Sequence, residues 1–369
     1  MHIRSLILTF ALPLLPIGIW KNADPTAEFC GRLGHDRDGD ALAREILARD
    51  YGVRDADLTR LCDGGVITGT LPSSDKHQMT LIGMVKLNST GAQFARYAEE
   101  VERLVATEYV SALGRIDLSD IEMALQLYPV MADDIREVPS CEVGDCDVKL
   151  PREVILEMAR LDPAASRFEA QVAAMIRDWL YQYVLSYRNS GNAVLVEYAD
   201  KDPPQSLHDG FGRLTADAQV LAYRVPSLHD YLNGIVDQPP NGARESFIWS
   251  VERFGMRPLT TVTQGVVYRD STTVNSDVWV AMKLLYASHY LHASLRLMRV
   301  MEDPASAEPV SYLVCVDRLL FDAKVGGIKR AIVKRRLRSH LAERMQAIRD
   351  SVGGYVSVAV DRSGGRQTR

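Results

Sequence analysis

Apolar residues in the first third of the chain change from helical to alternating spacing. Residues 40–61 carry apolar side chains three and four positions apart, which predicts a helical segment. Residues 77–87 alternate well enough for a strand, and residues 88–91 then supply helix-capping side chains. An amphipathic pattern over residues 94–105 predicts a helix, and residues 109–114 predict a further strand.

The middle of the chain returns to helical spacing. Apolar residues recur at this spacing through residues 152–187, and Asp162 with Pro163 divides the stretch into two predicted helices. A strand is predicted at residues 193–198 and a short helix at residues 228–236.

The last third is rich in β-branched and aromatic residues. Four segments of this kind predict antiparallel strands joined by short loops, at residues 247–252, 259–268, 278–301 and 312–316. Residues 328–352 then predict a long amphipathic helix.

The order of these elements decides the expected fold class. A strand and helix, a helical insert, a run of antiparallel strands and a terminal helix make an α+β plan rather than an alternating βαβ one. We expect one α+β domain over residues 66–352 with a helical insert at 152–187. An N-terminal helical segment at 28–65 precedes it, and a disordered tail at 353–369 follows it.

Residues 1–27 have the composition of an export signal. A short start containing Arg4 is followed by roughly 15 apolar residues, fewer than the ~20 that span a bilayer comfortably. Ala23 and Ala27 match a cleavage site poorly, so an uncleaved N-terminal anchor is the alternative to a signal peptide. We therefore expect a periplasmic or secreted protein, either free or anchored at its N-terminus.

Composition and charge exclude some classes of function. The 369 residues are 47% hydrophobic and 25% charged, as in a globular protein. A net charge of −5 argues against a nucleic-acid-binding protein. The sequence has no phosphate-binding loop, dinucleotide fingerprint or nucleophile-elbow motif, and we expect no cofactor.

Five cysteines fit an oxidising compartment. Cys141 and Cys146 flank Gly144 and Asp145, which can turn the chain back, so a disulfide is expected between them. Cys30 and Cys62 are the second expected pair. A zinc site at Cys141 and Cys146 is the alternative, but zinc normally takes four ligands and no second Cys or His pair lies nearby, so we expect no metal.

Two sets of residues resemble known protein families. Residues 79–87 with the helix from Gly91, and residues 314–317 with Gly326, Gly327 and the long helix, resemble the start and end of the START-like helix-grip superfamily. The resemblance spans residues 66–351 and implies a curved antiparallel sheet around a C-terminal helix, with a cavity for a lipid. Residues 141–151 and 286–290 resemble uncharacterised exported bacterial proteins, which implies export and carries no activity.

Strand alternation supplies candidate ligand-binding residues. On one sheet, Tyr286, Ser288 and Tyr290 share a face, opposite Leu285 and His289. Aromatic side chains with a few polar groups are typical of a pocket for an amphipathic ligand. The candidates are Trp249, Glu252, Tyr268, Trp279, Tyr286, Ser288, His289 and Tyr290. The alternative is an ordinary sheet core.

The terminal helix begins with a basic patch. The patch comprises Lys329, Arg330, Arg335, Arg336 and Arg338, with Lys334 between them. Cations near a helix N-terminus oppose its macrodipole, by roughly 0.3–1 kcal/mol each. An anionic membrane surface or acidic side chains of the domain would offset this cost.

Three functions remain in competition. The first is a non-catalytic, exported protein that binds a lipid or another apolar small molecule. The second is a periplasmic hydrolase that uses His289 or His292 with Glu252 or Asp317. The third is a protein-interaction module that uses the basic helix and the loop between Cys141 and Cys146.

Overall fold

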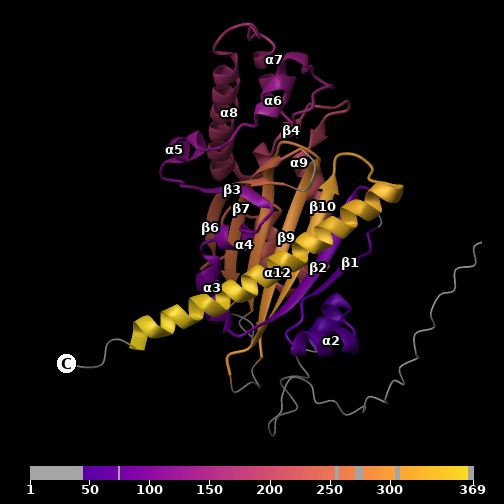
Figure 1. Ribbon diagram of the computed structural model, residues 1–369, viewed down its shortest axis with the longest axis vertical. Helices are drawn as coiled ribbons and strands as arrows, with labels where there is room; N and C mark the ends of the chain where they lie inside the picture. The colour runs from indigo at the N-terminus through magenta and orange to yellow at the C-terminus, as the bar shows by residue number, and fades with distance from the viewer. Residues whose placement is uncertain (1–44, 74, 254–256, 271–276, 304–307, 365–369) are drawn as a thin grey trace, which may run out of the picture.

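An eight-stranded antiparallel sheet forms the centre of the computed structural model, which describes residues 45–364 except 74, 254–256, 271–276 and 304–307 (Figure 1). The strand order is β1-β2-β10-β9-β8-β7-β6-β3. The strands pair in antiparallel fashion, and the helices lie in separate stretches between and after them. The α+β class expected from the sequence is therefore confirmed. The strands are β1 (Ile67–Leu71), β2 (Gln78–Leu87), β3 (Val110–Ile116), β6 (Arg244–Glu252), β7 (Leu259–Arg269), β8 (Val278–Ala287), β9 (Leu291–Glu302) and β10 (Ser311–Phe321).

Helices cover both faces of the sheet. The front face packs against α3 (Gly91–Ala98), α4 (Glu102–Val105) and α12 (Gly327–Gly364). On the back face, a helical segment at residues 45–51 and α2 (Asp55–Cys62) cover β2 and β10. The helices between β3 and β6 cover β6 to β9. Since both faces are covered, the strands contain long runs of buried residues, and all ten residues of β8 are buried.

The helix α12 crosses the front of the sheet diagonally (Figure 1). Its contact with β2 is close because Gly83 has no side chain: a Cβ there would lie 3.0 Å from Cγ of both Leu341 and Met345. The predicted terminal helix is therefore confirmed, and it extends to Gly364, beyond the expected end at Val352.

The helical insert is larger than the sequence indicated. Both helices expected at residues 152–187 are present, as α7 (Arg152–Met158) and α8 (Phe168–Ser190), but helices extend from α5 (Ile121–Gln126) to α11 (Pro226–Leu232). Other predicted elements are divided or shorter than expected: residues 94–105 contribute to two helices, α3 and α4, and residues 193–198 contribute only the two-residue strand β4 (Glu197–Tyr198). The remaining elements of this region are α6 (Ala132–Glu137), β5 (Gln205–Ser206), α9 (Leu207–Ala216) and α10 (Gln219–Arg224).

The segment 278–301, expected as one strand, is a hairpin of β8 and β9. At about 3.3 Å per residue, a single strand of this length would extend for about 80 Å, much longer than a typical strand. The chain reverses at Ser288, His289 and Tyr290, and Tyr290 has a φ of 59°, in the left-handed region. The polar residues in this segment mark the turn.

The disulfide between Cys141 and Cys146 is present, with an S–S distance of 2.05 Å. Cys62 is also disulfide-bonded, while its expected partner Cys30 lies outside the described residues, as does the expected export signal at residues 1–27. Cys315 is a buried free thiol in β10. Among the residues that the structure describes, none of the helices combines the length and the apolar composition that crossing a bilayer requires.

Candidate functional site

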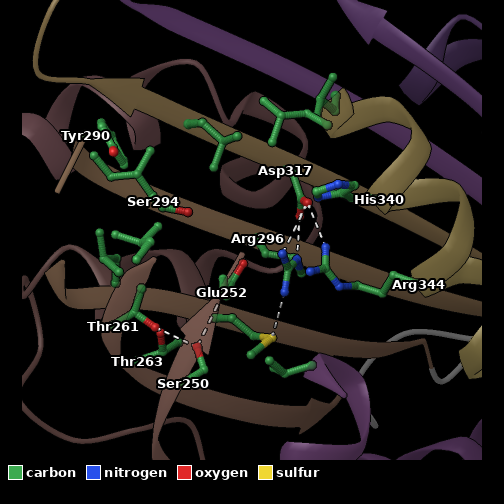
Figure 2. Close-up of a pocket in the computed structure, with 18 of the residues that line it drawn as sticks. Ser250, Glu252, Thr261, Thr263, Tyr290, Ser294, Arg296, Asp317, His340 and Arg344 are labelled. Atoms are coloured by element: carbon green, nitrogen blue, oxygen red, sulfur yellow. Dashed lines mark hydrogen bonds and ion pairs between the residues drawn. The ribbon is translucent and has the colours of Figure 1, made fainter. Parts of the chain in front are cut away.

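A cavity of about 110 Å³ lies between α12 and the front face of the sheet (Figure 2). Apolar residues from the strands form one wall, and Val333 and Leu337 of α12 lie across from them. The apolar strand residues are Leu81, Ile248, Leu259, Met282, Leu284, Leu291, Leu319 and Phe321. The cavity is smaller than the several hundred Å³ typical of ligand pockets and close in size to an engineered 150 Å³ cavity that binds benzene.

Strand alternation places polar residues on the same wall. Ser250 and Glu252 face the cavity from β6, two positions apart, and Thr261 and Thr263 do so from the neighbouring strand β7. The Ser250 and Thr261 hydroxyls are hydrogen-bonded at 2.8 Å, and Ser250 Oγ also lies 3.4 Å from Glu252 Oε1. This part of the wall offers hydroxyl groups and one carboxylate.

Three charged side chains meet at one end of the cavity. Arg296 of β9 donates from Nε to Asp317 Oδ1 at 2.5 Å and from Nη2 to Oδ2 at 3.3 Å. Arg344 of α12 donates from Nη1 to Asp317 Oδ2 at 3.4 Å. Burial alone would raise the pKa of Asp317, but the two guanidiniums outweigh it and hold that pKa below its ordinary value. Asp317 is therefore ionised at neutral pH.

His340 lies on α12, one turn before Arg344, and also lines the cavity. Burial, the largest effect, lowers its pKa to about 4, and the nearby Arg344 and Arg336 act in the same direction. The imidazole is therefore neutral at pH 7, and it stacks on Tyr109. The charges at this end of the cavity come from carboxylates and guanidiniums.

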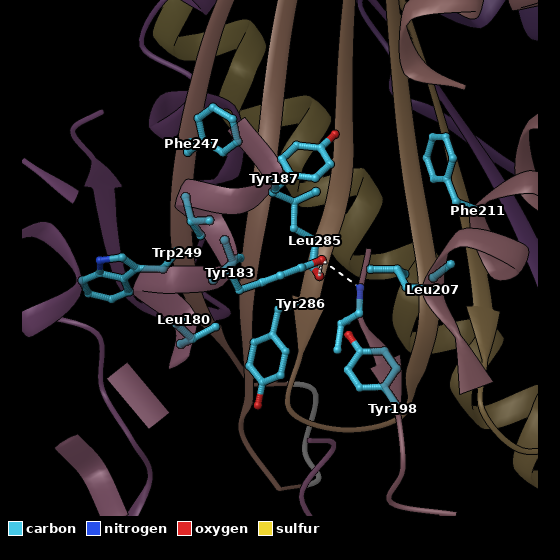
Figure 3. Packing of buried hydrophobic residues seen from close by; sticks show 14 of the residues in the cluster. Leu180, Tyr183, Tyr187, Tyr198, Leu207, Phe211, Phe247, Trp249, Leu285 and Tyr286 are labelled. Carbon is cyan, nitrogen blue, oxygen red and sulfur yellow. Dashed lines mark hydrogen bonds between the residues drawn. The ribbon is translucent and has the colours of Figure 1, made fainter. Parts of the chain in front are cut away.

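Two of the eight predicted ligand-binding residues, Glu252 and Tyr290, line this cavity. Trp249, Tyr268 and Tyr286 belong instead to the core on the back face of the sheet (Figure 3). The Trp249 ring lies over Gly114 of β3, where a Cβ would come within 2.4 Å of it. The prediction that Trp249, Tyr268 and Tyr286 line one pocket together with Tyr290 is therefore wrong.

A β-bulge moves Tyr286 to the back face, and the turn after β8 places Tyr290 at the front cavity. Val262 pairs with Tyr286 while Thr263 pairs with Leu284, so Leu285 has no partner across the ladder. Alternation is interrupted there, and it ends at the turn that contains Tyr290. One shift of register moves a side chain to the other face of a sheet.

Ser288 and His289 lie in the same turn and have structural partners outside the cavity. Ser288 Oγ accepts from the backbone N–H of Thr260 at 3.0 Å. His289 contacts the Asp147 carbonyl through Nδ1 at 2.9 Å and Asp134 Oδ1 through Nε2 at 3.0 Å. Both histidine nitrogens are thus occupied, and the turn is attached to the helical insert.

Trp279 lines a second cavity, of about 210 Å³, on the back face of the sheet. The charged groups in that cavity already have partners. Arg299 bonds to both Asp50 and Asp277, at 2.8 Å in each case, and Arg318 donates to a backbone carbonyl at 2.7 Å. This arrangement attaches the N-terminal helical segment to β9.

The residues of the hydrolase hypothesis are not brought together. His289 is bound to Asp134, and His292 Nε2 lies 2.7 Å from the Ser206 carbonyl. Glu252 and Asp317 instead line the front cavity, which contains neither histidine. The described residues also include no group of three or more His, Cys, Asp or Glu side chains placed to hold a metal ion.

Sequence reasoning missed Arg296 and Arg344. A signal for Arg344 existed: it follows Leu341 by three positions and precedes Ile348 by four, so it lies on the buried stripe of the terminal helix. Arg296 is similarly a charge within the largely apolar strand β9. Charged residues at such positions indicate a buried polar site.

The basic patch on α12 divides into three parts. Arg330 and Arg338 donate to backbone carbonyls, those of Gln78 at 2.8 Å and Thr68 at 2.9 Å. Arg336 lies at the cavity. Lys329 and Arg335 are exposed, and Arg335 borders an open groove with Lys334 and Arg338.

Comparison of the chain with protein-family models, with curated proteins and with solved structures finds no match.

Proposed function

We propose that the protein binds a small apolar or amphipathic molecule in the cavity between α12 and the sheet. The observation that supports this most is an unfilled, mainly apolar space with a few polar groups converging at one end. Protein interiors normally leave few voids larger than a water molecule, and ligand sites combine apolar walls with a small number of placed polar groups.

The topology supports a START-like helix-grip fold as part of this proposal. Two helices follow β2, the chain then enters the far edge strand β3, and β6 to β10 return strand by strand to pair with β2. The terminal helix α12 then closes the front face. A ligand between that helix and the sheet is what the resemblance implies.

The first turns of α12 are the proposed entrance. Leu341, Met345 and Ile348 are fully buried, whereas Ile328 is 81% and Ile332 50% exposed. The first turns of the helix, which lead up to the cavity-lining Val333, therefore bury fewer apolar side chains than the part that follows. We propose that these turns move outward to admit a ligand larger than the present cavity.

The same turns combine exposed isoleucines with the cations Lys329, Lys334 and Arg335. Apolar and basic side chains on one exposed helix favour contact with an anionic lipid surface. We propose such a surface as the place where the ligand is collected. The disulfide between Cys141 and Cys146 supports a periplasmic or secreted location.

A cavity-filling substitution tests the binding proposal. Ser294 lines the cavity from β9, so Ser294→Leu should occupy part of the space. We expect the variant to lose most binding of the uncharged fluorescent probe N-phenyl-1-naphthylamine while keeping or gaining stability. Leu285→Met, on the back face, is the control that should bind as the wild type does. Absence of probe binding to the wild-type protein would contradict the proposal.

A further inference from the structure

Arg344 has unused hydrogen-bonding capacity at the charged end of the cavity. A guanidinium carries five N–H donors. Arg344 is 5% exposed, its Nη1 makes the long bond to Asp317, and its Nε is buried with no hydrogen-bond partner. A buried donor without an acceptor destabilises the folded protein, so an acceptor placed there would stabilise the site.

Asp317 is bound more closely by Arg296 than by Arg344, and it leaves Nε of Arg344 without an acceptor. Both oxygens of Asp317 accept from Arg296, one of them at 2.5 Å. The only ion pair within 4 Å that the described residues give Arg344 is the one to Asp317. Glu252 attracts the guanidiniums of Arg296 and Arg344 electrostatically across the cavity but forms no ion pair with either. Arg336 adds a positive charge at the cavity.

We infer that the bound molecule carries a carboxylate, which Arg344 holds at the charged end of the cavity while the apolar part of the molecule lies against the strands. This inference rests on the proposed function and names its ligand class as that of a fatty acid. A carboxylate is planar and matches the two parallel donors of a guanidinium.

A phosphate monoester fits the same place less well. It carries a charge of about −1.5 to −2 and three acceptor oxygens. Asp317 and Glu252 would repel a dianion, and Arg296 is already committed to Asp317. A monoanion with two oxygens agrees better with the buried Nε donor of Arg344, which has no hydrogen-bond partner.

The test compares octanoate with its neutral isostere octanamide by isothermal titration calorimetry at pH 7.5. A charge-assisted hydrogen bond contributes roughly 1.5–3 kcal/mol, so octanoate should bind about 10- to 100-fold more tightly. Arg344→Gln should remove this preference, so that octanoate and octanamide bind the variant with similar affinity. Arg335→Gln is the matched control on the same helix, outside the cavity, and should keep the preference.

A second measurement uses the wild-type protein, so it does not depend on the folding of a variant. The carboxyl carbon of ¹³C-labelled octanoate reports its own titration by NMR. We expect the bound carboxyl to titrate at a lower pH than free octanoate because Arg344 stabilises its ionised form.

Each outcome separates the inference from the proposed function. Equal binding of octanoate and octanamide, or an unshifted or raised pKa of the bound carboxyl, overturns the carboxylate inference and leaves the cavity proposal standing. A preference that survives Arg344→Gln overturns the assignment to Arg344. If neither octanoate, octanamide nor the uncharged probe binds, the proposed function itself fails.

Discussion

Tyr286 and Tyr290 provide a matched pair for testing which face of the sheet carries the site. They lie four positions apart, yet Tyr286 is 1% exposed in the back-face core and Tyr290 lines the front cavity. Replacing each by Ala removes the same atoms from two different environments. The positive φ of Tyr290 is equally unfavourable for Tyr and Ala, so that contribution cancels.

The expected losses of stability follow from the packing. The Tyr286 ring contacts Trp179 edge-on at a centroid distance of 5.2 Å and lies 6.3 Å from Tyr198. Truncating such a buried aromatic residue costs about 3–5 kcal/mol. Tyr290 is half-buried beside a space that is already open, so Tyr290→Ala should cost less than about 2 kcal/mol.

Equilibrium unfolding in urea and titration with N-phenyl-1-naphthylamine together measure both effects. We expect Tyr286→Ala to lower the unfolding midpoint strongly while the folded fraction binds the probe normally. Tyr290→Ala should change probe affinity and lower the midpoint much less than Tyr286→Ala does. The opposite result, with probe binding sensitive to Tyr286 and stability sensitive to Tyr290, would refute the assignment of the two faces.

Three further predictions concern the charges, the disulfide and the surface. Asp317→Asn should lower the free energy of unfolding by about 3–5 kcal/mol, because Arg296 and Arg344 lose their shared counter-ion. Since the folded-state pKa of Asp317 is lowered, its contribution is present above the unfolded value of about 3.9 and lost as the pH falls through the folded value. The free energy of unfolding of the wild type should fall with this pH dependence in acid, whereas that of Asp317→Asn should lack it. Identical pH profiles for the two proteins would contradict this role of Asp317. Replacing Cys141 and Cys146 by Ala should cost about 2 kcal/mol for a loop of this length, and free thiols at both positions in the exported protein would contradict the expected compartment. Combined Lys329→Gln, Lys334→Gln and Arg335→Gln should weaken binding to vesicles containing phosphatidylglycerol, and wild-type binding should fall with salt; unchanged vesicle binding would exclude this surface.

Much of the architecture could be predicted from spacing alone. The strand before Gly91, the helices α7 and α8 and the terminal helix all follow from apolar periodicity and punctuation. Covalent attachment of Cys141 to Cys146 followed from the turn between them. These features depend on residues that are close in the sequence.

The side of the sheet that carries the cavity could not be predicted in the same way. Alternation distinguishes two faces only when one is polar, and here helices bury both. The unpaired Leu285 and the turn at Tyr290 then shift the register within a few residues. Arg344 reaches Asp317 and Arg296 only through the crossing of α12 over β10 and β9, which no local pattern specifies.

The most direct test of the cavity proposal is to locate a bound ligand by NMR. Intermolecular nuclear Overhauser effects between N-phenyl-1-naphthylamine and labelled methyl groups identify the face that it occupies. We predict effects to Leu284, Leu319 and Leu337, which line the front cavity, and none to Leu180 and Leu285 in the back-face core. Effects confined to Leu180 and Leu285, or no specific effect at any methyl group, would contradict the assignment of ligand binding to the space between α12 and the sheet.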